Sequence, residues 1–343
     1  VKAMNRVYIL ILIVLLTACG SKSLPEFTVT ITNDQDFDRE ELVEVPISVI
    51  SKQVLLLDEE QYIVLDSEGN QVPYQVTWND NILFLAIVKA NAEAVYTIAV
   101  GGPIEVEPLV YGRHYPECVD DIAWDRAYGP ALQDKGERAF GYDVWVKRVP
   151  ELVVEQRYAN ELNPDTQAEI VRLRKARKWD EANDLYNSIS SHVDHGDGLD
   201  CYKVGPTLGC GTTALMQGDA ILYPYCWKEY EIMENGPLRF TTKLIYNPII
   251  VGKDSVVETR IISLEKGSQL NKTIVSYAGL SKATPIATGL VIHPEHPAAY
   301  VLDGEKGYIA YADLTDNVHN GNGVIYVGAV MPSKVMETRA LMF

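Results

Sequence analysis

The alternation of apolar and polar residues in short segments constrains the fold of this chain most strongly. Between Phe27 and Val100 this alternation recurs in segments that are separated by turn residues: FTVTITN, LVEVPISVI, QYIVLDSEGNQV, ILFLAIV and AVYTIAV. A period of two puts one face of a strand on a core and the other in solvent. Residues 237–279 show the same alternation in longer runs. The sequence therefore predicts an all-β protein, built as a large antiparallel β-sandwich.

Residues 164–190 depart from this pattern. Pro164 and Asp165 suit the first turn of a helix, and apolar residues from Ile170 to Leu185 recur at helical intervals. We therefore expect one helical insertion at 164–190. Its basic run, residues 172–178, is followed by acidic residues. That arrangement is typical of a solvated helix face with local ion pairs.

The punctuation of the chain predicts its domain organisation. Gly101-Gly102-Pro103 closes the first group of strands, so residues 27–102 are expected to form an N-terminal β-sandwich segment. Residues 103–343 are expected to form the main β-sandwich domain, which contains the helical insertion. Because the chain stops at ETRALMF inside a strand-like pattern, we expect the last strands of this domain to lie beyond residue 343.

The first residues have the features of an export signal. Lys2 and Arg6 precede an apolar run from Val7 to Leu16, which is too short to span a bilayer as a permanent helix. The Leu-Thr-Ala-Cys that ends at Cys19 resembles a lipoprotein signal. We expect residues 1–18 to be a signal peptide, Cys19 to carry the lipid and residues 19–26 to be a tether. This predicts an exported lipoprotein, membrane-anchored in the periplasm or at the cell surface.

Charge narrows the range of partners. The chain has 30 basic and 47 acidic residues, a net charge of −17. Nucleic-acid binding needs clustered Lys and Arg, so no nucleic-acid partner is expected. A polyanionic ligand would require a local basic patch. The oligomeric state does not follow from these observations.

Four cysteines remain if Cys19 is lipidated: Cys118, Cys201, Cys210 and Cys226. In an exported protein an even number allows disulfides, and reduced buried cysteines are the alternative. The chain has no CxxC pair, which argues against a four-cysteine zinc site.

The stretch HVDHGDGLDCYKVGPTLGCG, residues 192–211, supplies the candidate catalytic residues His192, His195, Asp200 and Lys203. Histidine exchanges protons near neutral pH, and a carboxylate partner fixes its tautomer. The alternative is a polar loop whose aspartates cap turns. No cofactor is expected. Calcium held by the aspartates, or a transition metal on the histidines, stays as a weaker alternative.

Three further groups suit sugar binding, because aromatic faces pack on pyranose rings and arginine forks bind carboxylates. They are Trp124, Asp125, Arg126 and Tyr128; Trp145 and Arg148; and Glu258 and Arg260. The alternative for each group is structural: an ion pair that closes a loop, a solvent-facing strand surface, or isolated surface charges.

Several long blocks together resemble a known family. They include VTITNDQDFDREELVEVPI, DDIAWDRAYGPAL, GYDVWVKRVPELVV, ENGPLRFTTKLIY, VVETRIISLEKGSQLNK and YADLTDNVHNGNGVIYVGAVM. The sequence resembles the bacterial lipoproteins grouped as domain of unknown function 4861 (DUF4861), whose genes lie beside those of polysaccharide-degrading enzymes. The resemblance implies a galactose-mutarotase-like β-sandwich and an oligosaccharide or polysaccharide partner. It favours an envelope-anchored enzyme, a glycoside hydrolase or polysaccharide lyase, that acts on uronic-acid-containing oligosaccharides by hydrolysis or β-elimination. A non-catalytic glycan-binding lipoprotein and a sugar epimerase or mutarotase are the alternatives.

Overall fold

The computed structural model describes residues 25–57, 60–117, 121–124, 127–129, 141–314, 322–332, 335 and 337. Every paired strand in these ranges is antiparallel, and the all-β prediction is confirmed. The predicted signal peptide, Cys19, Cys118, Asp125 and Arg126 lie outside the described residues. Within those ranges no helix is both long and apolar enough to cross a membrane.

The N-terminal strands form a small sandwich of two three-stranded sheets. One sheet has the order β1 (Phe27–Asn33), β6 (Ala92–Gly101), β3 (Gln61–Leu65); the other has β2 (Arg39–Pro46), β5 (Asn81–Val88), β4 (Tyr74–Val76). Alternation along β3, β5 and β6 points Val64, Ile82, Phe84 and Ile98 into a shared core, where each is fully buried. The sequence pattern and the core agree because one face of each sheet is covered.

The strand predicted over LVEVPISVI is wrong in its second half. β2 ends at Pro46, and a single helical turn, α1 (Ile47–Ile50), follows. Pro46 has no N–H to donate to a strand ladder, and it precedes the turn with φ −61° and ψ 130°. The turn places Ile50 in the core, where it is fully buried.

The main domain is built on a five-stranded sheet. It contains β14 (Trp227–Asn235), β15 (Arg239–Tyr246), β17 (Asp254–Glu265), β16 (Ile249–Val251) and β18 (Lys272–Ala278). On β17 every second residue from Val256 to Leu264 is buried. This face packs against other parts of the domain through Ile122, Trp124 and Tyr142.

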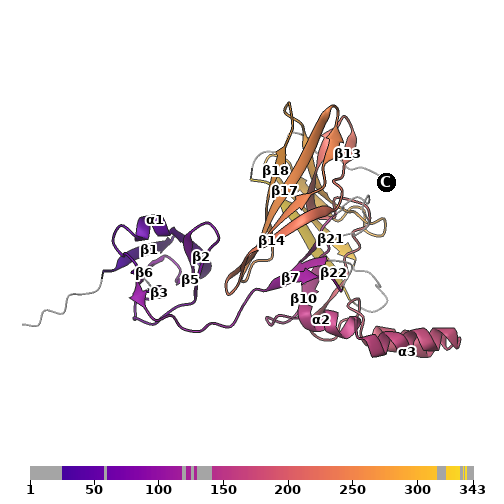
Figure 1. The fold of residues 1–343 in the computed structure, drawn as a ribbon, viewed down its shortest axis with the longest axis horizontal. Coiled ribbons are helices and arrows are strands. Elements are labelled where there is room, and N and C mark those ends of the chain that lie inside the picture. Colours follow the sequence, from indigo (N-terminus) through magenta and orange to yellow (C-terminus); the bar gives the residue numbers. More distant parts are fainter. Residues whose placement is uncertain are drawn as a thin grey trace, which may run out of the picture.

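Smaller sheets complete the main domain (Figure 1). They comprise β12 (Cys210–Gln217) with β13 (Ala220–Leu222) and β19 (Ile286–Leu290); β20 (Tyr300–Asp303) with β21 (Tyr308–Leu314) and β22 (Val324–Val330); β7 (Gly112–Tyr115) with β8 (Asp121–Trp124) and β9 (Ala127–Gly129); and β10 (Trp145–Lys147) with β11 (Gly198–Asp200).

Three helices lie between β10 and β11: α2 (Val154–Glu161), α3 (Pro164–Lys175) and α4 (Trp179–Asn187). The last two occupy the segment in which a helical insertion was predicted. Asn163 caps α3 by accepting the Thr166 N–H at 3.0 Å, and Pro164 follows it at the first helical position. The apolar pattern of residues 140–154 also suits a strand, but β10 ends at Lys147 and α2 begins at Val154. Figure 1 shows α3 projecting away from the sheets.

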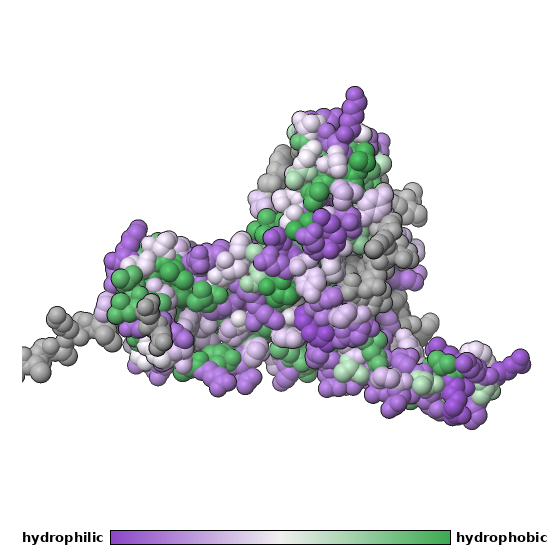
Figure 2. Space-filling view, viewed as in Figure 1, coloured by the Kyte–Doolittle hydropathy of each residue, from purple (hydrophilic) through white to green (hydrophobic). Residues whose placement is uncertain are grey.

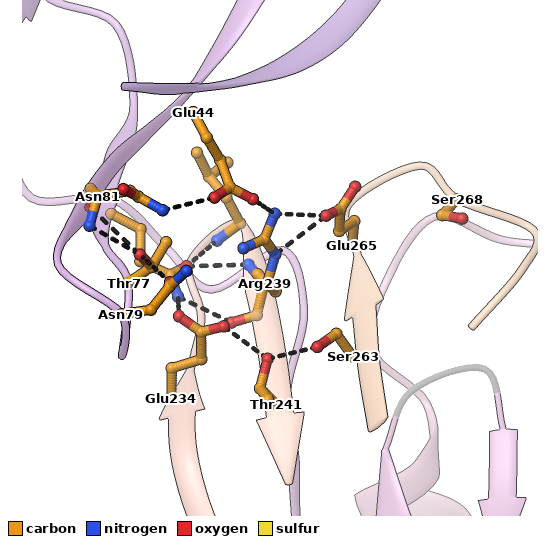
Figure 3. A network of polar contacts seen from close by, with 12 residues as sticks. Glu44, Thr77, Asn79, Asn81, Glu234, Arg239, Thr241, Ser263, Glu265 and Ser268 are labelled. Carbon is orange, nitrogen blue, oxygen red and sulfur yellow. Dashed lines mark hydrogen bonds and ion pairs between the residues drawn. The ribbon is translucent and has the colours of Figure 1, made fainter. Parts of the chain in front are cut away.

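A polar network joins the N-terminal sandwich to the main sheet (Figure 3). Arg239, on β15, forms ion pairs with Glu44 of β2 and with Glu265, whose oxygen lies 3.0 Å from Nε. The buried Gln75 donates to Glu234 at 3.1 Å and accepts the Arg239 N–H at 2.9 Å. Buried polar groups that satisfy one another in this way specify one relative orientation of two surfaces.

Arg239→Ala should weaken this junction. The change removes a nearly buried guanidinium and leaves two carboxylates close together. We therefore expect the free energy of unfolding to fall by about 2–3 kcal/mol, which is less than the ~3–5 kcal/mol lost when a fully buried ion pair is broken. Calorimetry should show a lower melting temperature and a separate early transition of the N-terminal sandwich. Arg39→Ala, at an exposed ion pair with Glu41, is the control and should be nearly neutral. An unchanged melting profile in Arg239→Ala would contradict the assigned role.

Candidate functional site

The loop predicted to carry catalysis is anchored at β11. Trp145 of β10 pairs with Asp200, and Lys147 pairs with Gly198. Gly198 has φ +110°, and a Cβ there would collide with the Val146 carbonyl oxygen, so the close strand pairing requires glycine. From α2, Arg157 donates to the Gly198 carbonyl and forms an ion pair with Asp197. The loop is therefore held by both a strand and a helix.

His192 and Asp200 lie together at this position. His192 Nδ1 is 3.3 Å from the Asp200 carbonyl oxygen and 3.4 Å from its carboxylate Oδ2. Both atoms are acceptors, so in the neutral ring Nδ1 carries the proton and Nε2 holds the lone pair. The imidazole is 45% exposed while the Asp200 side chain is 14% exposed. A partly buried carboxylate thus orients a histidine that solvent and ligands can reach.

A second carboxylate, that of Asp143, interacts electrostatically with His192. Asp143 is held just before β10, and its Oδ1 accepts the Val144 N–H at 2.9 Å. Burial raises the pKa of Asp143 to about 6, and the nearby His192 opposes part of that rise. A carboxyl group with such a pKa can be protonated or ionised under mildly acidic to neutral conditions. Asp143, His192 and Asp200, here called the acid–base cluster, therefore combine three titratable groups.

The other two predicted catalytic residues are placed differently. His195 Nε2 lies 3.1 Å from the Ser190 carbonyl oxygen, so this ring contacts the loop's own backbone. The Lys203 side chain is exposed, and its carbonyl faces His293 Nε2 at 2.8 Å. Asp200 is the neighbour of His192 and not of His195, which the sequence spacing alone did not distinguish.

The remaining loop aspartates make structural contacts. Asp194 accepts the N–H groups of Gly196 and Gly198 at 2.8 and 3.2 Å and forms an ion pair with Arg148 at 2.9 Å. Asp197 is paired with Arg157. Over the described ranges, no three His, Cys, Asp or Glu side chains are grouped so that they could hold a metal ion.

Glu258 and Arg260 share one face of β17, as predicted, but that face is interior. Their side chains are 3% and 1% exposed and form an ion pair at 2.5 Å. Arg260 also donates to the Thr212 hydroxyl at 2.7 Å and to the Thr213 carbonyl at 3.0 Å, both on β12. Its guanidinium lies 4.6 Å from the ring centre of Tyr246. The pair therefore bridges two sheets inside the domain.

The aromatic candidates are also largely interior. Trp124 is 1% exposed, stacks on Phe240 with ring centres 5.8 Å apart and donates to Asn271 at 3.0 Å. Trp145 is 8% exposed. Tyr128 belongs to β9. Among the predicted sugar-binding residues whose side chains are described, Arg148 is the accessible one, at 57% exposure.

His293 belongs to a histidine–carboxylate pair that was not among the candidate residues predicted from the sequence. Its Nδ1 lies 2.6 Å from Asp313 Oδ2, and the Tyr311 hydroxyl donates to Asp313 Oδ1 at 2.8 Å. Since Nε2 faces the Lys203 carbonyl, both ring nitrogens are engaged and the ring is fixed. The alternation of Tyr311 and Asp313 on a strand was visible, but their contact with His293 depends on tertiary folding.

Cys201, Cys210 and Cys226 are reduced cysteines in the structure. Burial raises the pKa of Cys210 to about 11, which disfavours its thiolate as a nucleophile. For these three cysteines the structure therefore supports the reduced alternative and not a disulfide.

Comparison with known proteins places the chain in a family. The model of a domain of unknown function, DUF4861, matches residues 31–341. The chain belongs to the DUF4861 family. A curated relative, "Uncharacterized protein P7" of Formosa agariphila, is 26% identical over 248 residues, which are 68% of this chain and 56% of the relative. The DUF4861 chain thus spans little more than half the length of this relative. Neither description names a reaction.

Removing Glu258 should destabilise this DUF4861 protein severely. Glu258→Ala leaves the Arg260 guanidinium buried without its carboxylate, at a cost of about 3–5 kcal/mol. Chemical denaturation of the variant measures this loss. Glu231→Ala, which breaks the exposed ion pair with Lys243, is the matched control and should cost less than about 1 kcal/mol. Similar losses in the two variants would show that Glu258 is not a buried partner.

Asp143→Asn should stabilise the protein in a pH-dependent way. The pKa of Asp143 is raised on folding, so its ionisation opposes folding above the unfolded pKa, and the cost grows until pH passes about 6. The gain in melting temperature of the variant should therefore be larger at about pH 8 than at about pH 4. Asp38→Asn should show the opposite trend, because Lys89 lowers the pKa of Asp38. A gain for Asp143→Asn that is independent of pH would contradict the assignment.

Proposed function

We propose that this protein is a carbohydrate-active enzyme, held at the cell envelope through Cys19, that acts on uronic-acid-containing oligosaccharides. The observation that carries the proposal is the acid–base cluster: an accessible imidazole oriented by Asp200, together with Asp143, which interacts with His192 and whose pKa is raised to about 6. Perturbed carboxyl groups beside an oriented histidine are typical of sites that transfer protons.

The cluster suits β-elimination. His192 Nε2 takes the proton on the carbon next to the uronate carboxyl group, and the resulting electron pair forms the new C=C bond as the glycosidic C–O bond breaks. Protonated Asp143 supplies a proton to the departing oxygen, and Asp200 stabilises the imidazolium that forms. Arg148, which is accessible, is the candidate to bind the uronate carboxylate.

Hydrolysis uses the same groups in other roles. Asp143 protonates the glycosidic oxygen, and His192 removes a proton from the water that attacks the anomeric carbon. The two reactions give different products, since elimination leaves an unsaturated sugar and hydrolysis consumes one water. The geometry of the cluster is compatible with both.

A separate feature favours the alternative of glycan binding without catalysis. Trp227 and Tyr230 of β14 lie with ring centres 5.4 Å apart, and His114 of β7 is 4.7 Å from Tyr230. The Tyr230 hydroxyl lies 3.1 Å from His114 Nδ1, and Tyr230 is 41% exposed. Partly exposed aromatic rings of this kind suit contacts with the C–H faces of sugars.

Turnover of uronic oligosaccharides tests the proposal. His192→Ala and Asp143→Asn should each lower the rate by about 100-fold or more, the usual contribution of a general acid or base. The assay follows both reducing ends and the absorbance of new C=C bonds. His195→Ala, at a loop histidine that faces a backbone carbonyl, is the control and should keep most of the activity.

The outcomes separate the alternatives. Binding without product in the wild-type protein would overturn the enzyme proposal in favour of a glycan-binding lipoprotein. A change in anomer ratio without cleavage would indicate an epimerase or mutarotase. Equal losses in His192→Ala and His195→Ala would show that the loop's shape matters and not the acid–base cluster.

A further inference from the structure

The end of α3 and the turn that leads into α4 carry charge opposite to that of the protein as a whole. The chain has a net charge of −17, yet residues 170–179, IVRLRKARKW, contain five basic residues and no acidic one. The five are exposed and lie at the end of α3 and in the turn to α4. Figure 1 shows α3 projecting from the body, and the corresponding surface in Figure 2 is largely hydrophilic. We call residues 172–179 the basic tip.

Local carboxylates neutralise only part of the basic tip. Arg172 is paired with Glu169 at 2.5 Å and Lys178 with Glu181 at 2.8 Å. Arg174, Lys175 and Arg177 form no salt bridge with any described residue; the Arg174 guanidinium instead lies 5.9 Å from the ring centre of Tyr186. The ion-paired helix face expected from the sequence therefore accounts for two of the five cations.

An exposed aromatic ring adjoins these cations. Trp179, the first residue of α4, is 56% exposed. The exposed ring gives the basic tip a flat apolar surface next to its cations. Aromatic rings and guanidinium groups together are well suited to sugars that carry acidic groups.

The backbone of Arg177 supplies an independent observation. Arg177 has φ +58°, and the Lys178 N–H donates to the Leu173 carbonyl at 3.0 Å where α3 ends. This left-handed position after a helix is usually glycine, because other residues pay a steric cost there. The backbone of Arg177 is therefore strained. A glycine at this position would avoid the strain but would lack the guanidinium group.

We propose that the basic tip is a binding site for a polyanionic polysaccharide. Carboxylate or sulfate groups along the sugar chain pair with Arg174, Lys175 and Arg177, while a sugar ring packs on Trp179. The inference rests on the proposed function, since it assigns a longer, charged chain as the partner from which the acid–base cluster takes its substrate. The acidic remainder of the surface repels such a chain and leaves the basic tip as the favourable point of contact.

The position of the basic tip favours a polysaccharide over a lipid surface. β1, the first described strand, lies at one end of the long axis in Figure 1, and α3 lies at the other. A lipid on Cys19 would precede β1 in the chain. The basic tip is therefore on the side of the protein remote from the strand nearest the predicted anchor.

Binding of polygalacturonate to the full chain tests this site. Arg174→Glu/Lys175→Glu should weaken binding by at least about tenfold, because like charges then face the ligand. Arg177→Gly should weaken it by about two- to fivefold, as expected for one exposed charge contact. Since glycine relieves the strained backbone, the melting temperature of Arg177→Gly should stay the same or rise. Weaker binding together with equal or greater stability is a result that a purely structural role would not give.

A matched control separates local from overall charge. Lys52→Glu/Lys253→Glu makes the same change in net charge at two exposed lysines outside the basic tip, and should leave binding within about twofold. Dextran, a neutral polysaccharide, should not bind at the basic tip. Equal losses in the two double variants, or unchanged binding in Arg174→Glu/Lys175→Glu, would overturn the proposal. So would tip-dependent binding to phosphatidylglycerol vesicles without binding to polygalacturonate.

The two proposals fail in different ways. If the basic tip is wrong but the acid–base cluster is right, His192→Ala abolishes turnover of short oligosaccharides while the tip variants bind polygalacturonate normally. If the cluster is wrong but the tip is right, polygalacturonate binding depends on the tip and His192→Ala changes no product.

Discussion

The architecture of the main domain depends on one buried arginine. Arg260 points from the long strand β17 into the space between two sheets, where a pair of apolar side chains would be simpler to accommodate. The cost of burying the guanidinium is offset by hydrogen bonds. Glu258 accepts one of them, and a hydroxyl and a carbonyl oxygen of β12 accept two more. These partners lie at a point where the pairing of β12 with β19 shifts register between Cys210 and Thr213. The arginine therefore fixes how the irregular strand sits on the regular sheet, in a way that apolar packing alone does not.

From β12 the constraint extends to the acid–base cluster. β12 is the next strand after β11, which ends at Asp200. Tyr142, which neighbours Asp143, packs in the core with residues of β15 and β17. Gly198 and Arg157 then hold β11 against β10. Asp200 ends β11 and Asp143 lies two residues before β10, so the pairing of these two strands positions both carboxylates through backbone structure.

The sequence predicted elements well where periodicity decides structure and poorly where long-range contacts do. FTVTITN became β1 with its bounds unchanged, since alternation alone specifies a half-buried strand. The alternation did not reveal that the β17 face with Glu258 and Arg260 is interior. Charged residues at alternate positions give the same sequence pattern whether their face is buried or exposed. Choosing between His192 and His195 required knowing which ring meets Asp200, and α2 was hidden in a segment rich in valine that also suits a strand.

Net charge is a poor guide to ligands when charges are segregated in space. α3 has 12 residues, and a helix of that length extends about 18 Å. The Debye length at physiological ionic strength is about 8 Å, so fields from the acidic body are largely screened at the end of such a projection. The cations of the basic tip therefore act on a ligand almost as if the body were neutral. A chain at −17 can in this way repel polyanions over most of its surface and still attract them at one end, which orients the encounter without a basic cleft near the acid–base cluster.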